Sequence, residues 1–226
     1  MTIKYHHDIE QGSDEWHALR CGILTASEMK LIVTPTMKTA SNDKERSHLY
    51  ELLGQRITGH VEPSYISDDM LRGREDEIEA RIRYEEHYQP VTECGFITSD
   101  DIGFVIGYSP DGLVGDDGLI ECKSRRQKYQ VETILQDEVP AEYMIQCQTG
   151  LMVTRRKWLD FISYSAGLPM FVKRVFPNQA MQDAIAQASY AFEKRIELAR
   201  TKYADNLARF PVIITTERTI EQEIYA

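Results

Sequence analysis

The spacing of hydrophobic residues changes from a helical period to a period of two near residue 95. This change restricts the fold more than any other feature of the chain. After it come short apolar runs, separated by clusters of Gly, Asp and Ser that are typical of turns. The predicted strands are Gly95–Thr98, Gly103–Tyr108, Leu119–Lys123, Trp158–Tyr164 and Met170–Phe176.

Helix signals surround these strands. Thr25 and Glu28 have the spacing of a capping box, which predicts a short helix through Val33. A longer helix over Asp43–Thr58 is closed by Gly59. Three further helices are predicted. One runs from Ser67 or Asp68 to about Tyr88, and a second has Pro140 in its first turn and continues to about Val153. The third spans roughly Asn178–Leu207.

The last of these helices has an apolar stripe at steps of three and four residues, which indicates a face packed on the core. The stripe consists of Met181, Ile185, Ala188, Phe192, Ile196, Ala199 and Tyr203. The order of elements predicts an α/β fold in which helices flank a mixed central sheet. We expect a single domain over residues 1–226.

Length, charge and cysteine spacing exclude several classes of protein. The 226 residues are enough to bury a core, and no run approaches the ~20 apolar residues of a membrane helix. The start of the chain lacks the apolar segment of a signal peptide, and the four cysteines are scattered, so we expect a cytoplasmic protein without disulfides. The net charge of −10 argues against a protein that coats nucleic acid. Basic runs at 123–128 and 155–157 could line a local groove or form solvated faces.

Two acidic residues and a lysine form the most informative pattern. Asp111 follows a proline, and ten residues later come Glu121 and Lys123 with one residue between them. Carboxylates of this kind can hold a divalent metal beside a scissile phosphate, and the lysine can position the attacking water. A strand places Glu121 and Lys123 on one face and Cys122 on the other, with the Cys122 carbonyl still available to a metal. The alternative is a surface hairpin with a charged outer face.

The length of the hairpin loop decides whether the two acidic residues share a face. A two-residue loop would point Asp111 away from Glu121. A three-residue loop over residues 116–118 places Asp111 opposite Lys123, and all three polar groups then share a face. Gly118 also occupies the position at which such a loop needs a left-handed residue. We therefore predict the three-residue loop.

Three segments together resemble the motifs of the YqaJ-like viral recombinase family. They are Glu15–Glu28, Ser109–Leu113 with Glu121–Lys123, and Tyr143–Gln148, and they occur in the family's order. The resemblance implies a restriction-endonuclease-like core and a magnesium-dependent exonuclease with two metal ions, for which Mn²⁺ can substitute. It also implies digestion of double-stranded DNA from 5′ ends, leaving a 3′ single strand, by a ring-shaped homotrimer that works with a single-strand annealing protein.

The same resemblance suggests roles for individual residues. The metal ligands would be Asp111, Glu121 and the backbone carbonyl of Cys122, and the base would be Lys123. Gln146 would lie near the same site, and an additional acid from a helix would be Glu77, although helical geometry alone does not choose between Glu77 and Glu75. The pocket for a terminal 5′ phosphate would consist of Arg20, Ser27 and Ser109, with a second basic residue among Arg125, Arg126 and Lys128.

Two alternatives share this fold class. One is a site-specific DNA endonuclease, which would need the same carboxylates but no pocket for DNA ends. The other is a DNA-end-binding module that has lost catalysis, which the intact set of Asp111, Glu121 and Lys123 disfavours. Ser27 also has a simpler interpretation, since it lies inside the predicted capping box and could serve only the helix.

Overall fold

The computed structural model describes residues 2–63 and 67–218, and its strands form two four-stranded mixed sheets. The first sheet has the order β1-β3-β4-β2, with β2 parallel to β4. The second has the order β5-β6-β7-β8, with β6 parallel to β7. The strands are β1 (Ile3–His6), β2 (Leu24–Thr25), β3 (Phe96–Ser99), β4 (Ile106–Tyr108), β5 (Gly112–Val114), β6 (Gly118–Ser124), β7 (Trp158–Tyr164) and β8 (Phe171–Val175).

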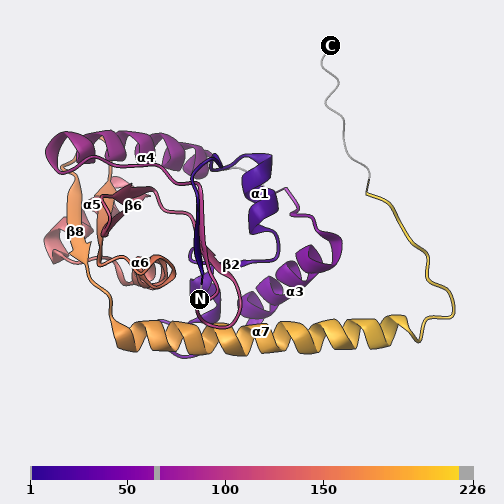
Figure 1. Ribbon diagram of the computed structural model, residues 1–226. Coiled ribbons are helices and arrows are strands. Elements are labelled where there is room, and N and C mark those ends of the chain that lie inside the picture. Colours follow the sequence, from indigo (N-terminus) through magenta and orange to yellow (C-terminus); the bar gives the residue numbers. More distant parts are fainter. Residues whose placement is uncertain (1, 64–66, 219–226) are drawn as a thin grey trace, which may run out of the picture.

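Helices cover both faces of the second sheet (Figure 1). On one face α4 packs Ala80 and Tyr84 against Ile120 and Cys122. On the other face lies α6, and the long α7 packs across both α6 and α3. The helices are α1 (Asp14–Arg20), α2 (Met29–Ile32), α3 (Asp43–Thr58), α4 (Asp68–His87), α5 (Gln127–Gln136), α6 (Ala141–Thr154) and α7 (Gln179–Leu207).

Most of the predicted elements are present, and the predicted α/β class with helices flanking mixed sheets is confirmed. The limits of α3 and β7 are those predicted, and Gly59 closes α3 in the left-handed conformation. Ser67 caps α4 by accepting from the Met70 N–H. The stripe of α7 is buried at Ile185, Ala188, Phe192 and Ile196, whereas Tyr203 near its end is exposed.

The expectation of one central sheet was wrong, because the strands divide between two sheets. The predicted strand over Gly103–Tyr108 is shortened to β4, since Gly103 lies in a turn with a φ of +90°. The capping box was also wrong. Thr25 belongs to β2 and pairs with Gly107, and α2 begins only at Met29 without a side-chain cap.

The hairpin of β5 and β6 has a three-residue loop, but not at the predicted position. Val114 pairs with Gly118, so the loop is residues 115–117, and Gly115 rather than Gly118 has a positive φ, at +51°. Gly118 meets a different need, because a Cβ there would lie 2.2 Å from atoms of the Trp158 ring. Continuing the register places Asp111 opposite Glu121 instead of Lys123. Asp111 still lies on the same face of the hairpin as Glu121 and Lys123, because the observed register differs from the predicted one by an even number of residues.

The basic run at 155–157 contacts the chain itself. Arg156 donates to the carbonyl oxygens of Gly115 and Gly118, each at 2.7 Å, and so joins the two ends of the hairpin loop. Lys157 pairs with Asp117 in the same loop, and Arg155 pairs with Asp101.

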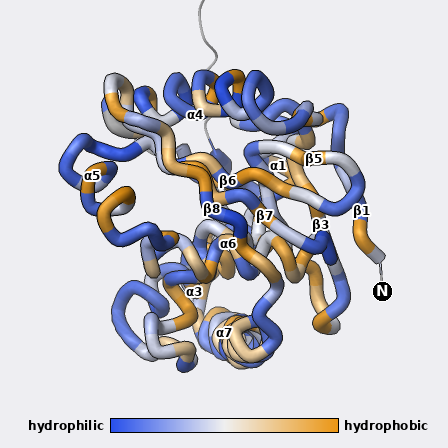
Figure 2. The backbone as a smooth tube through the Cα atoms, turned by 90° about the vertical axis from the view of Figure 1, so that its left-hand side faces the viewer, coloured by the Kyte–Doolittle hydropathy of each residue, from blue (hydrophilic) through white to orange (hydrophobic). Residues whose placement is uncertain are grey.

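In Figure 2, which views α7 end-on, the strands of the second sheet lie between α4 above and α7 below. Within residues 2–63 and 67–218, no helix has both the length and the apolar character needed to cross a membrane.

Candidate active site

Glu121 is the centre of the site. Its side chain points from β6 into the interior with 1% exposure. Tyr108 from β4 donates to its Oε2 at 2.8 Å, and Gln146 from α6 donates to its Oε1 at 2.5 Å. Lys123 lies two residues further along the same face, with its Nζ 2.6 Å from Glu121 Oε1. Three elements therefore fix one carboxylate, and predicted neighbours Lys123 and Gln146 both reach it.

Asp111 lies just before β5, and its Oδ2 accepts from the Cys122 N–H at 2.5 Å. Burial, followed by the negative charges of Glu121 and Glu77, raises the pKa of Asp111 well above its usual value, while Lys123 opposes this. The structure thus places Asp111 beside Glu121, as the sequence predicted. The Cys122 side chain packs on the opposite face, against α4, also as predicted.

The acid that α4 contributes is Glu77. Burial and then the charge of Glu121 raise the pKa of Glu77, and the positive charges of Lys123 and Arg81 oppose the shift. Glu75, the other candidate on this helix, is exposed to solvent. Helical periodicity did not distinguish these two residues, because each aligned with apolar neighbours, but the structure turns Glu77 toward the carboxylates.

Lys123 is held in its charged form by its neighbours. Burial alone would lower the pKa of an ammonium group, but the adjacent carboxylates of Glu121 and Asp111 outweigh burial and raise it. The Nζ atom also lies 5.7 Å from the centre of the Tyr143 ring. A lysine in this position acts as a fixed positive charge and hydrogen-bond donor at physiological pH.

The chemistry of these residues fits a hard divalent cation. Asp111, Glu121 and Glu77 bring negative charge into a buried space, and the raised pKa values of Asp111 and Glu77 show that this charge is only partly compensated. Among the described residues, no group of three or more His, Cys, Asp or Glu side chains lies close enough together to hold a metal ion by itself. Mg²⁺ retains several waters, so two carboxylates and a backbone carbonyl are enough.

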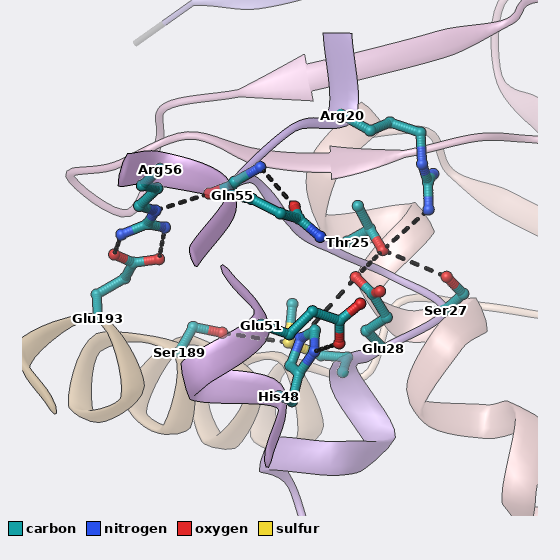
Figure 3. A network of polar contacts seen from close by, with 12 residues as sticks. Arg20, Thr25, Ser27, Glu28, His48, Glu51, Gln55, Arg56, Ser189 and Glu193 are labelled. Atoms are coloured by element: carbon teal, nitrogen blue, oxygen red, sulfur yellow. Dashed lines mark hydrogen bonds and ion pairs between the residues drawn. The ribbon is translucent and has the colours of Figure 1, made fainter. Parts of the chain in front are cut away.

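A second polar group surrounds Arg20, at the end of α1 (Figure 3). Arg20 donates from Nη1 to Ser109 Oγ at 3.1 Å and from Nη2 to Thr25 Oγ1 at 3.4 Å. The Ser27 hydroxyl lies 3.3 Å from that of Thr25, so the three predicted pocket residues Arg20, Ser27 and Ser109 belong to one network. Because Ser27 lies outside α2 and makes no cap, its interpretation as a helix cap was wrong.

The loop that follows Arg20 is fixed by α3. Gln55 accepts from the Gly22 N–H at 2.8 Å, and Arg56 donates to the Gly22 carbonyl at 2.8 Å. Arg56 is itself held by both carboxylate oxygens of Glu193 on α7 (Figure 3). Gly22 has a φ of +70°, and a Cβ there would lie 2.6 Å from the Arg56 side chain. A glycine is therefore required at this position.

Sequence reasoning missed two residues of the site. Trp16 was assigned no role, yet its Nε1 donates to Ser109 Oγ at 3.0 Å and its ring lies 4.1 Å from the Arg20 guanidinium carbon. Tyr108 was not singled out, although it binds Glu121. A signal for Tyr108 was present, because a tyrosine in a buried strand needs a partner for its hydroxyl.

The three candidates for a second basic pocket residue point in different directions. Arg125 turns toward α6, where its Nη1 donates to Glu142 at 2.6 Å and to the Tyr143 hydroxyl at 2.7 Å. It therefore shares the Tyr143 ring with Lys123 and lies on the catalytic side. Arg126 and Lys128 are exposed. The choice among the three stays a prediction.

Mixed sheets flanked by helices, with Asp111 beside the Glu121 and Lys123 side chains of β6, are typical of nucleases that use a divalent metal. The chain belongs to the YqaJ-like viral recombinase domain family, whose sequence profile matches residues 15–157. Comparison with the sequences of curated proteins gives no match.

Solved structures agree with this assignment. An alkaline exonuclease from Laribacter hongkongensis, LHK-Exo, is 34% identical with a TM-score of 0.77, over 87% of this chain and 99% of that chain. LHK-Exo in complex with dAMP is 35% identical with a TM-score of 0.72, over 86% and 100%. A phage related exonuclease from Haemophilus somnus 129PT, at 14% identity and a TM-score of 0.58 over 80% and 96%, shares the fold.

Proposed function

We propose that this nuclease is a 5′→3′ exonuclease that digests linear double-stranded DNA and leaves 3′ single-stranded overhangs for recombination by strand annealing. One observation carries the proposal. Ser109 belongs to the Arg20 network, and Asp111, two residues later, belongs to the carboxylate cluster. Two residues span at most about 7 Å, so a terminal phosphate held by Arg20 would lie next to the catalytic groups. This arrangement suits removal of one nucleotide at a time from a 5′ end.

Asp111, Glu121 and the Cys122 carbonyl would hold Mg²⁺, with two ions expected and Mn²⁺ as a substitute. When bound, the metal would stabilise negative charge on the phosphate under attack. Lys123 would position the attacking water, as its location beside Glu121 suggests. Tyr108 and Gln146 would keep the Glu121 carboxylate oriented, and Glu77 would supply the additional acid.

The pocket also defines which bond must break. An enzyme that reads a 5′ phosphate can repeat its reaction only if each cut leaves a 5′ phosphate on the shortened strand. Water would therefore form the new bond to phosphorus, and the bond from phosphorus to the 3′ oxygen would break, with that oxygen taking up a proton. The released nucleotide keeps its own 5′ phosphate. LHK-Exo, the 35% identical relative, is known in complex with such a nucleotide, dAMP.

Self-association is part of the proposal. We propose a homotrimeric ring of single nuclease domains over residues 1–226, acting in the cytoplasm with a single-strand annealing protein. Large apolar side chains along α4 support self-association, since they are between 43% and 53% exposed in the single chain. They are Met70, Leu71, Ile78 and Ile82.

Digestion of matched duplexes with and without a 5′ phosphate tests the proposed activity. Arg20→Ala should slow digestion of phosphorylated ends about ten- to a hundredfold more than that of hydroxyl ends, since a charge-assisted hydrogen bond is worth roughly 1.5–3 kcal/mol. Arg200→Ala is a matched control, because Arg200 pairs with Glu197 on the exposed surface of α7. Equal slowing of both ends by Arg20→Ala would contradict the pocket, and cleavage of circular duplex would favour an endonuclease.

A further inference from the structure

A phosphate pocket in an exonuclease must release its ligand after every cut. The inference drawn here rests on the proposed function, because it concerns how the Arg20 pocket holds and releases a 5′ phosphate. A half-buried arginine flanked by hydroxyl donors would bind the leaving mononucleotide as firmly as the next DNA end. A negative charge near Arg20 would weaken phosphate binding, and Glu28 supplies such a charge.

Glu28 is connected to Arg20 through a single hydroxyl group (Figure 3). Thr25 Oγ1 donates to Glu28 Oε2 at 2.6 Å and accepts from Arg20 Nη2. Because a hydroxyl has one hydrogen, Ser27 must be the donor in its contact with Thr25. Burial lowers the pKa of Arg20 and the negative charge of Glu28 raises it, so the two groups influence each other. Glu28 is thus a counter-charge for Arg20 when no phosphate is present.

The side chain of His48, on α3, lies next to the Glu28 carboxylate and helps to fix its position. His48 on α3 is buried, with its ring stacked on Phe192 of α7 at 5.6 Å between centroids. Its Nδ1 lies 3.2 Å from Glu51, and its Nε2, which has no hydrogen-bond partner, lies 3.9 Å from Glu28 Oε2. The imidazole therefore occupies the space behind the Glu28 carboxylate and restricts its retreat from the pocket.

We propose that Glu28 is a release residue, which competes with the 5′ phosphate for Arg20 and so keeps mononucleotide binding weak. A phosphate that binds Arg20, Ser27 and Ser109 is placed near a carboxylate of the same charge, held two hydrogen bonds away. This repulsion is present for the product and for the DNA end alike. It shortens the time for which the released nucleotide blocks the site, whereas the duplex keeps its other contacts.

Inhibition of digestion by dAMP measures this effect directly. Glu28→Gln keeps an acceptor for the Thr25 hydroxyl but removes the charge, and should lower the dAMP inhibition constant by roughly tenfold, as expected for one unit charge in partly solvated surroundings. The preference for 5′-phosphorylated over 5′-hydroxyl ends should rise. Inhibition by adenosine, which lacks the phosphate, should not change.

Two further variants separate charge from structure. Glu28→Asp retains the charge and should keep a dAMP inhibition constant near that of the parent protein. Glu51→Gln makes the same substitution on the far side of His48 and should also leave it unchanged. Weaker or unchanged dAMP inhibition in Glu28→Gln would overturn the role, as would equally tight dAMP binding in Glu51→Gln. Absence of any 5′-phosphate preference in the parent protein would instead contradict the proposed function itself.

Discussion

The ion pair between Lys123 and Glu121 can be removed without loss of the other hydrogen bonds that hold Glu121. Glu121 retains hydrogen bonds from Tyr108 and Gln146 when the lysine is lost. Lys123→Ala should therefore reduce cleavage by on the order of 10²–10³, the usual loss when one preorganised hydrogen-bond donor of an active site is removed. Binding of duplex ends, measured with Ca²⁺ in place of Mg²⁺, should stay close to that of the parent protein. Near-normal turnover in this variant would remove Lys123 from the mechanism.

Asp111 carries a different prediction, because its charge is costly in the folded protein. A carboxyl with a pKa above its unfolded value destabilises the fold as pH rises from the unfolded pKa, near 4, through the raised one. Asp111→Asn removes that cost and keeps an acceptor for the Cys122 N–H. Without metal at pH 8, its Tm should rise by about 2–4 °C, the equivalent of ~1 kcal/mol in a chain of this size.

The same variant should lose most of the rise in Tm that Mg²⁺ gives the parent protein, and its cleavage should stop. Thermal unfolding with a chelator and with Mg²⁺ provides both measurements. Two results would show that bound Mg²⁺ does not offset the cost of the Asp111 charge. One is a Tm of Asp111→Asn below that of the parent protein in the chelator, and the other is a rise in Tm with Mg²⁺ equal to that of the parent protein.

At the scale of elements, α4 offers a matched pair of acids. Glu77 faces the carboxylate cluster, whereas Glu75 on the same helix faces solvent. Glu77→Gln should lower metal-dependent cleavage roughly 10- to 100-fold, which is the usual effect of losing a residue that acts on the metal ligands rather than on the metal itself. Glu75→Gln should leave cleavage unchanged, with rates compared over a titration of Mg²⁺. Similar losses in both variants would indicate an effect of α4 itself rather than of one face.

Elements with strong local signals were predictable from the sequence, and elements defined by distant partners were not. Helix α3 has its own cap and closing glycine, so its limits followed from nearby residues. Thr25 was misread, because its strand forms by pairing with β4, more than 80 residues away. The hairpin register failed at Gly118 for the same reason, since the Trp158 ring determines the need for glycine there.

The candidate site shows the same division. Asp111, Glu121 and Lys123 could be predicted because strand periodicity places acid and lysine on one face. The role of Trp16 and the partner of the Tyr108 hydroxyl could not, because they depend on contacts with Ser109 and Glu121 that the fold brings together.

For the whole molecule, the distribution of charge bears on how DNA is held. The chain has a net charge of −10, and its basic runs are largely engaged with its own acceptors. Arg155 and Lys157 pair with acidic residues, Arg156 holds the hairpin loop, and Arg125 binds Glu142. The basic residues of these two runs that pair with their own neighbours are less available to the DNA backbone. Long runs of digestion would then depend on enclosure of the duplex by the proposed ring rather than on strong attraction.

Enclosure predicts that salt affects the capture of an end and the length of a run differently. Each phosphate contact releases counterions, so raising salt from about 50 to 200 mM should sharply reduce the rate of capture. A duplex already inside a ring cannot leave by sideways diffusion, so the nucleotides removed per capture should change little. Digestion of a long labelled duplex, chased with excess unlabelled ends at each salt concentration, measures both quantities, and light scattering of the same sample gives the number of chains. If run length falls in parallel with capture, or the mass is that of one chain, attraction rather than enclosure holds the DNA.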